Sequence, residues 1–170
     1  STLGKVDVLG FDSNLSANIE QLTEVSGQAD FVVAPETLSK ADGWDYAGWL
    51  LKLAADTSMT DAELATAAQD SYYAYYGYNA NVTLQNMDTS GSKVGDLVAA
   101  IGDFVTAVGT MTDLKDDLLA AIDANRLAGD SGLVDLNGFM TAIENDADPE
   151  VTTGIKDAAA AVKTALDAAM

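Results

Sequence analysis

The first 34 residues contain two short apolar runs, and between them apolar residues recur at the spacing of a helix. Residues 5–12 and 30–34 are mostly apolar and are bounded by turn-forming residues, which is typical of buried strands. The apolar positions between them recur at helical spacing: Leu15, Ile19 and Leu22. Ser13 or Asn14 is placed to cap that helix. Because two strands joined through a helix normally pair in parallel, we predict a βαβ unit.

The rest of the chain is predicted to be mostly helical, with one more strand. Thr60 and Glu63 have the spacing of a capping box, which opens a helix running to about Tyr76. Residues 82–87 alternate as a strand does. Further helices are predicted at 46–56, 94–108, 114–122, 139–143 and from Pro149 to Met170. The fold class is therefore α/β, with a parallel or mixed sheet flanked by helices.

Three strands are few for such a sheet. Parallel sheets are normally covered on both faces and continue into further strands. We therefore expect the sheet to be incomplete without upstream strands, supplied by an upstream chain or by self-association. Ser1 stands in place of an initiator methionine. This predicts a chain that was processed or cut from a longer one.

The charge of the chain excludes several kinds of partner. Asp and Glu number 27 against 8 Lys and Arg, a net charge of −19 over 170 residues. Nucleic-acid binding needs clustered basic residues, so we expect none. No apolar run is long enough for a membrane span. The acidic side chains either keep the surface solvated or attract calcium or a basic peptide.

The chain contains no cysteine and no histidine. It therefore cannot supply a cysteine nucleophile, a cysteine-ligated zinc site or a Ser–His pair by itself.

Polar side chains follow both predicted parallel strands, where ligands of open α/β sheets usually bind. After the first strand come Asp12, Ser13 and Asn14, and after the second come Glu36, Asp42 and Asp45. Carboxylates from the two strand ends would form a crevice for a cationic side chain or a hard metal ion. In the alternative interpretation, Asp12 and Asn14 only cap the following helix.

Two of these stretches resemble the clostripain-like cysteine peptidases. Residues 10–18 read GFDSNLSAN, where that family typically has GFDxCLMAN around its nucleophile. Residues 29–36 read ADFVVAPE and residues 42–50 read DGWDYAGWL, similar to the family's ADYVVASEE and GDGWDYxGWL at matching spacing. Weaker likenesses follow at 82–88 and 134–139. The resemblance covers nearly the whole chain.

The resemblance implies a caspase-like fold, a Cys–His dyad, cleavage after basic residues and often calcium dependence. Asn14 stands where the family has its nucleophilic cysteine, and Asp12 and Asp42 stand where acidic residues line the pocket for a substrate Arg or Lys. The loop residues retained around them are Glu36, Gly43, Trp44 and Asp45. Residues 1–170 would then be a single domain or the C-terminal portion of a clostripain-like catalytic domain.

Asn14 decides which function is expected. An amide nitrogen is not a nucleophile and has no thiolate form, so an acyl-enzyme cannot form. We expect a catalytically inactive homologue that binds a protein or basic peptide, outside the cell or at its surface. One alternative is the later chain of a two-chain endopeptidase, inactivated at position 14. Another is an acidic, self-associating surface component. Calcium is the one cofactor that the acidic residues suggest.

Overall fold

The computed structural model describes residues 4–78, 82–109, 114–127 and 132–170, and it divides into two compact units. Residues 1–94 together with residue 170 form a sheet with helices on both faces, and residues 95–169 form a helical unit. The sheet unit carries the residues that the sequence singled out.

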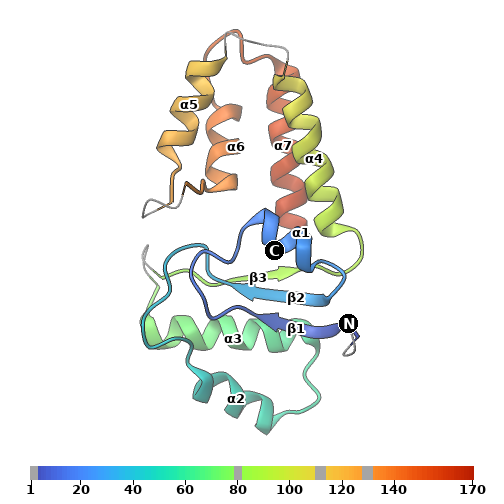
Figure 1. Ribbon diagram of the computed structural model, residues 1–170, viewed down its shortest axis with the longest axis vertical. Helices are drawn as coiled ribbons and strands as arrows, with labels where there is room; N and C mark the ends of the chain where they lie inside the picture. The colour runs from blue at the N-terminus through green and yellow to red at the C-terminus, as the bar shows by residue number, and fades with distance from the viewer. Residues whose placement is uncertain (1–3, 79–81, 110–113, 128–131) are drawn as a thin grey trace. The chain divides into compact units, whose positions relative to one another are not determined.

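The sheet has three strands in the order β1-β2-β3 (Figure 1). The strands are β1 (Val6–Gly10), β2 (Ala29–Ala34) and β3 (Gln85–Asp88). β1 pairs with β2 in parallel, and β2 pairs with β3 antiparallel. The predicted mixed sheet and its parallel first pair are confirmed. As a consequence, the carboxyl ends of β1 and β2 lie at the same edge of the sheet.

The helix between these strands, α1 (Ile19–Val25), begins later than the sequence predicted. Its cap is Asn18, whose side-chain oxygen accepts a hydrogen bond from the Gln21 N–H at 2.8 Å. The predicted capping by Ser13 or Asn14 is wrong. Leu15 has a φ of +59°, outside the helical range, so the chain forms a loop before the helix starts. That loop leaves Asp12 and Asn14 available for other contacts.

The two faces of the sheet are covered by different helices (Figure 1). One face packs against α3 (Asp61–Tyr76), and α2 (Tyr46–Ala55) packs on α3. The buried side chains on this face are Val33, Trp44, Ala65, Ala68, Tyr72, Val82 and Leu84. The other packs against α1, and its buried residues are Leu22, Ala29, Val32, Ala34, Met87 and Val94. Over residues 32–34 of β2, successive side chains point to opposite faces, as the two-residue period of a strand requires.

The α3 helix is held at both ends. The predicted capping box is present: Thr60 Oγ1 accepts from the Glu63 N–H, and the Glu63 carboxylate accepts from the Thr60 N–H. Near its end, Tyr73 packs on β3's flank, where its hydroxyl accepts a 3.0 Å hydrogen bond from the Leu84 N–H. Among the neighbouring tyrosines, Tyr72 is buried in the core, whereas Tyr75 and Tyr78 are exposed.

The helical unit contains α4 (Lys93–Val108) from Gly95 onward. It also contains α5 (Lys115–Ala124), α6 (Leu136–Glu144) and α7 (Thr153–Ala169). α6 packs along α7, and its buried residues Met140 and Ile143 contribute to the core of the unit. The predicted start of the last helix at Pro149 is wrong. Asp148 accepts a 2.8 Å hydrogen bond from the Glu150 N–H, so this stretch forms a turn and α7 begins only at Thr153.

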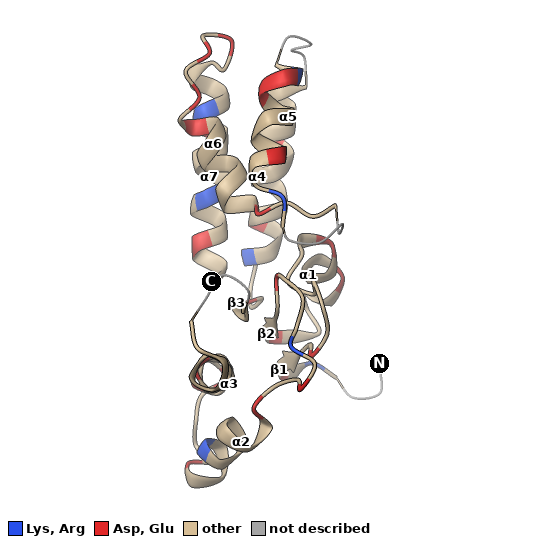
Figure 2. Cartoon of the chain, turned by 90° about the vertical axis from the view of Figure 1, so that its left-hand side faces the viewer, with Lys and Arg blue, Asp and Glu red and all other residues tan. Residues whose placement is uncertain are grey.

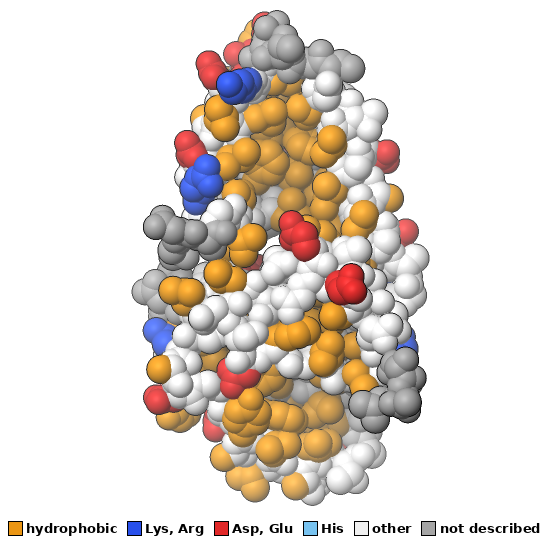
Figure 3. Space-filling view, viewed as in Figure 1, with side chains coloured by type: hydrophobic (Ala, Val, Ile, Leu, Met, Phe, Trp, Pro, Cys, Tyr) orange, Lys and Arg blue, Asp and Glu red, His pale blue; other side chains and the backbone are white. Residues whose placement is uncertain are grey.

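None of the described helices is both long and apolar enough to cross a membrane. Acidic residues lie on elements of both units (Figure 2), and the sequence has 27 of them against 8 basic ones. The sheet unit also exposes apolar surface at α2, which has no buried residue (Figure 3). Leu51 of that helix is 70% exposed.

Candidate functional site

Two loops meet at the carboxyl edge of the parallel strands. We call residues 11–18, which follow β1, the first loop, and residues 35–45, which follow β2, the second loop. Backbone hydrogen bonds of 2.9–3.1 Å join them at the pairs Leu15–Thr37 and Ala17–Pro35. The loops therefore form one structure, as the parallel pairing of their strands predicts.

Asn14 lies at the exposed tip of the first loop and bonds to the second loop. Its side-chain oxygen accepts a 2.8 Å hydrogen bond from the Ser39 N–H, and the Ser39 hydroxyl donates to the Ser13 carbonyl at 3.2 Å. The next residue, Leu15, has the positive φ noted above, a conformation that costs an L-residue about 1–3 kcal/mol. The amide at position 14 is thus held in a fixed place by a strained loop.

Asp12 connects the first loop to the start of α2. Its Oδ2 accepts hydrogen bonds from the Trp44 N–H at 3.2 Å and from the Tyr46 hydroxyl at 2.9 Å. Its Oδ1 has no hydrogen bond with the described parts of the chain. The interpretation that Asp12 and Asn14 only cap the helix is wrong, because both side chains bond to the second loop or to the residue that follows it.

Gly43 lets the second loop pass close to Asp12. Its φ is +71°, and a Cβ built on it would lie 2.6 Å from Asp12 Oδ2. A side chain at this position would therefore be both strained and in collision with the carboxylate. Asp42 immediately precedes Gly43 and is exposed, so the second loop brings a further carboxylate to this edge of the sheet.

Replacing Gly43 by alanine is expected to destabilise the chain by about 3 kcal/mol, from backbone strain and the collision with Asp12. Gly91→Ala is the matched control, because Gly91 also has a positive φ (+63°) but open space around it. The control should lose only about 1 kcal/mol. Urea unfolding of both variants measures the difference, and equal losses would contradict a close contact between Gly43 and Asp12.

Three other residues of the second loop make structural contacts. The buried Trp44 ring covers Gly10, where a Cβ would lie 2.8 Å from the indole. Asp45 caps α2, because its carboxylate accepts a 3.1 Å hydrogen bond from the Gly48 N–H. Glu36 is anchored through its backbone N–H, which donates to Thr83 Oγ1 at 3.1 Å.

Tyrosine hydroxyls around the site lie in the negative field of the two carboxylates. The pKa of Tyr46 is raised, chiefly because its hydroxyl donates to Asp12. Burial raises the pKa of Tyr76, and the nearby charges of Asp42 and Asp12 raise it further. The Tyr76 hydroxyl donates a 2.7 Å hydrogen bond to the Gly43 carbonyl. Because Asp42 and Asp12 act on the same phenol, they create one region of negative potential.

The raised pKa values predict a loss of stability in alkali. The folded state keeps Tyr46 and Tyr76 protonated at a pH where unfolded tyrosine, with a pKa of about 10, has ionised. This contribution is complete below pH 10 and is lost as the pH rises through the higher folded values. Urea unfolding at pH 9 and pH 11 should show the loss, and Tyr46→Phe should reduce it. An equal loss in the variant would contradict the assignment to Tyr46.

One group of carboxylates in the described residues could approach a metal ion. Asp7, Asp30 and Asp61 have carboxylate oxygens within 4.8 Å of one another, but Lys5 already forms an ion pair with Asp30. Their strand and helix positions are separate from the two loops. Nothing in their arrangement ties a metal ion to the region around Asp12.

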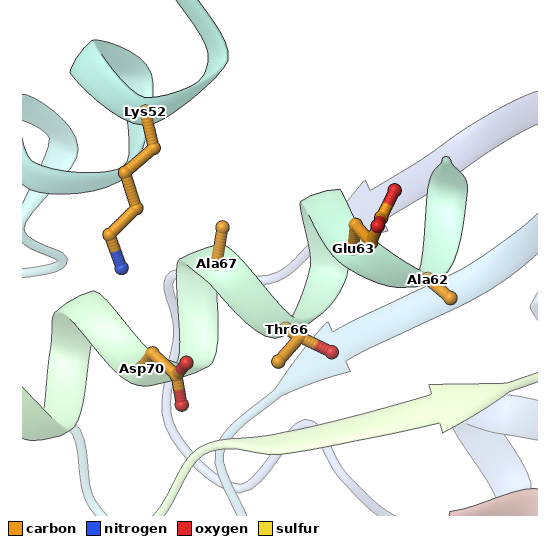
Figure 4. A pocket seen from close by; sticks show the side chains of 6 residues that line it. All are labelled: Lys52, Ala62, Glu63, Thr66, Ala67 and Asp70. Carbon is orange, nitrogen blue, oxygen red and sulfur yellow. The ribbon is translucent and has the colours of Figure 1, made fainter. Parts of the chain in front are cut away.

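A groove of about 330 Å³ lies between α2 and α3 (Figure 4). In the close view, Lys52 extends from α2 toward α3. The groove shares no residue with the two loops, and its lining consists of Lys52, Ala62, Glu63, Thr66, Ala67 and Asp70. It is a separate feature of the surface.

Sequence reasoning missed Tyr46 and Tyr76 as parts of the site. Tyr46 lies within the DGWDYAGWL stretch, so its position was visible, but only the structure shows its hydroxyl on Asp12. Tyr76 is 33 residues from Gly43, and no spacing signal connects them.

Comparison with solved structures shows the same fold in cysteine proteases. A Bacteroides fragilis cysteine protease matches with a TM-score of 0.68 at 13% identity, over 99% of this chain and 67% of that one. A Bacteroides thetaiotaomicron clostripain in complex with a peptide inhibitor matches with 0.64 at 15% identity, over 92% and 65%. A secreted C11 cysteine protease from the same species, in complex with an irreversible peptide inhibitor, gives 0.54 at 18%, over 89% and 41%.

These likenesses confirm the caspase-like α/β fold. The chain spans about two thirds of the first two proteins and about two fifths of the third. A comparison with curated protein sequences gave no match. The model of the clostripain family matches residues 1–164, nearly the whole chain. This chain therefore belongs to the clostripain family of peptidases.

Proposed function

We propose that this chain is a non-catalytic member of the clostripain family that binds a basic side chain of a peptide or protein. The observation that carries the proposal is the combination of Asn14 with Asp12 and Asp42 at one sheet edge. The position that would attack a peptide bond holds an amide, while the carboxylates that would receive a cationic side chain are present.

Asn14 removes the chemistry of covalent catalysis. A thiolate attacks a carbonyl because sulfur offers an available electron pair, whereas the electron pair of an amide nitrogen is delocalised into its carbonyl. The Asn14 oxygen is already an acceptor for the Ser39 N–H. The side chain is therefore used to hold the two loops together.

The carboxylates supply the recognition. Within the described structure, Asp12 Oδ1 can accept a hydrogen bond from a ligand. Asp42 is exposed and immediately precedes Gly43, which lies against Asp12. A cationic group placed there gains from both charges and from hydrogen bonding to a charged acceptor. Calcium and a metal-dependent role find no comparable support at these loops.

Peptides that differ at one side chain test the proposal. A fluorescent hexapeptide with one central lysine should bind the chain at least about tenfold more tightly than the same peptide with norleucine, because only the charged side chain reaches the carboxylates. Fluorescence anisotropy measures both affinities, and raising the salt concentration should weaken only the lysine peptide. Equal affinities would contradict the proposal.

A second candidate function is considered because the chain covers only part of the length of the solved structures that it resembles. In this alternative, the chain is the later chain of a two-chain cysteine endopeptidase that cleaves after Arg or Lys, inactivated at position 14. The chain aligns over 99% of its own length to 67% of a cysteine protease, so part of that protein has no counterpart in it. β1 is an outer strand of the three-stranded sheet, so strands from an upstream segment or from another copy of the chain could pair with its free side. In that case Asn14→Cys, in the presence of a segment that carries a histidine, should give cleavage after basic residues. Continued inactivity of the restored protein would count against this function.

Location outside the cell is part of the proposal. One structural neighbour is a secreted protease, and the excess of acidic residues fits a solvated surface. Immunodetection of the natural protein in culture supernatant and in cell fractions tests this location.

A further inference from the structure

The Asp12 carboxylate presents two unequal oxygens to a ligand. Oδ2 accepts from the Trp44 N–H and from the Tyr46 hydroxyl, so both of its lone pairs are in use. Oδ1 has no hydrogen bond within the described residues. Gly43, which approaches Oδ2 rather than Oδ1, leaves this difference in place: a Cβ on Gly43 would lie 2.6 Å from Oδ2 but 3.5 Å from Oδ1.

Lysine and arginine make different demands on such a carboxylate. The arginine guanidinium gains most from a fork of two parallel N–H donors, one to each oxygen of a single carboxylate. The lysine ammonium is a compact point charge whose three donors can go to separate acceptors. Asp12 in its present contacts offers one oxygen, and Asp42 beside Gly43 supplies a second, separate acceptor.

We propose that the Tyr46 hydroxyl makes this site favour lysine over arginine by occupying Asp12 Oδ2. This inference rests on the proposed function, since it concerns the side chain that the two carboxylates receive. The lysine ammonium donates to Asp12 Oδ1 and to Asp42 without disturbing any contact. The arginine fork would have to displace the Tyr46 hydroxyl or bind through one nitrogen only.

Several features keep Tyr46 in this role. Its ring stacks against Trp44, with centroids 6.3 Å apart, and contacts Trp49 at the same distance. Asp45 caps α2 immediately before it, which fixes the first turn that carries the tyrosine. The phenol is protonated at neutral pH, and the hydrogen bond to Asp12 raises its pKa further, so the hydroxyl remains a donor to Asp12.

Removing one oxygen atom tests the inference. In Tyr46→Phe, the ring packing remains and one lone pair of Asp12 Oδ2 is released. Affinities of two hexapeptides that differ only in a central lysine or arginine are measured for the 170-residue chain and the variant. The unsubstituted chain should bind the lysine peptide more tightly than the arginine peptide. The variant should shift the ratio of affinities toward arginine by about fivefold or more.

Tyr75→Phe is the matched control, because Tyr75 is a 60% exposed tyrosine of α3 without a contact to Asp12, and it should leave the ratio unchanged. Thermal unfolding verifies that Tyr46→Phe folds. If the arginine peptide binds the unsubstituted chain as tightly as the lysine peptide or more tightly, or if Tyr46→Phe leaves the ratio unchanged while both peptides bind, the inference is overturned and the proposed function stands. If neither peptide binds better than its norleucine analogue, both fail together.

Discussion

Peptide and ester substrates with arginine or lysine are expected to remain uncleaved in the presence of this chain, with or without calcium. Loss of a catalytic nucleophile costs a protease on the order of 10⁶-fold in kcat, because covalent attack is replaced by the uncatalysed path. Asn14 bears an amide at the tip of the first loop, and the chain has no cysteine that could take over. Chromogenic ester and amide substrates, followed over hours against buffer blanks, measure the rate.

The control for this measurement is a substrate with norleucine in place of the basic residue, which reports background hydrolysis. The nearby hydroxyls of Ser13 and Ser16 bond to each other at 2.6 Å, and no histidine exists in the chain to activate either one. Turnover of the basic substrate above background, abolished by Asp12→Asn, would show that the loops catalyse after all.

Asp12→Asn is expected to weaken the binding of a lysine peptide by about tenfold or more, since it replaces a charged acceptor at the site by a neutral one. The substitution keeps the shape of the side chain and an oxygen for the Trp44 N–H, so the second loop should stay in place. The pKa of Tyr46 should fall toward its usual value at the same time, because Asp12 is what raises it. Anisotropy and ultraviolet phenol titration give the two readouts.

Asp103→Asn is the control for net charge, because it removes one exposed carboxylate from α4 without altering the loops. It should leave both the peptide affinity and the phenol titration unchanged. If both variants weaken binding equally, the attraction comes from the overall charge of −19 and not from a site at Asp12.

Much of the sheet unit could be predicted because its signals are local. The two parallel strands are short apolar runs, and the capping box at Thr60 and Glu63 depends on side chains three residues apart. The end of α3 at Tyr76 agrees with its prediction because Gly77 follows, with a φ of +78° that halts the helix.

The errors arose where the sequence allows two arrangements with similar local signals. Asn14 and Asn18 are both reasonable caps from the sequence alone, and the choice depends on Ser39, 25 residues away, whose N–H bonds to Asn14. Pro149 is a good first residue for a helix, but the Asp148 carboxylate accepts a hydrogen bond from the Glu150 N–H, and the stretch forms a turn. The same limitation hid the contacts of Tyr46 and Tyr76 with the site.

The most direct test of the account uses Asn14→Cys, which introduces a single thiol into a chain without cysteine. Asn14 is exposed, so iodoacetamide should alkylate the new thiol readily, and mass spectrometry follows the rate. If a basic side chain binds at Asp12 and Asp42, a saturating lysine peptide should slow alkylation about tenfold or more, and its norleucine analogue should not. Equal alkylation rates with both peptides would contradict a binding site for basic side chains beside position 14.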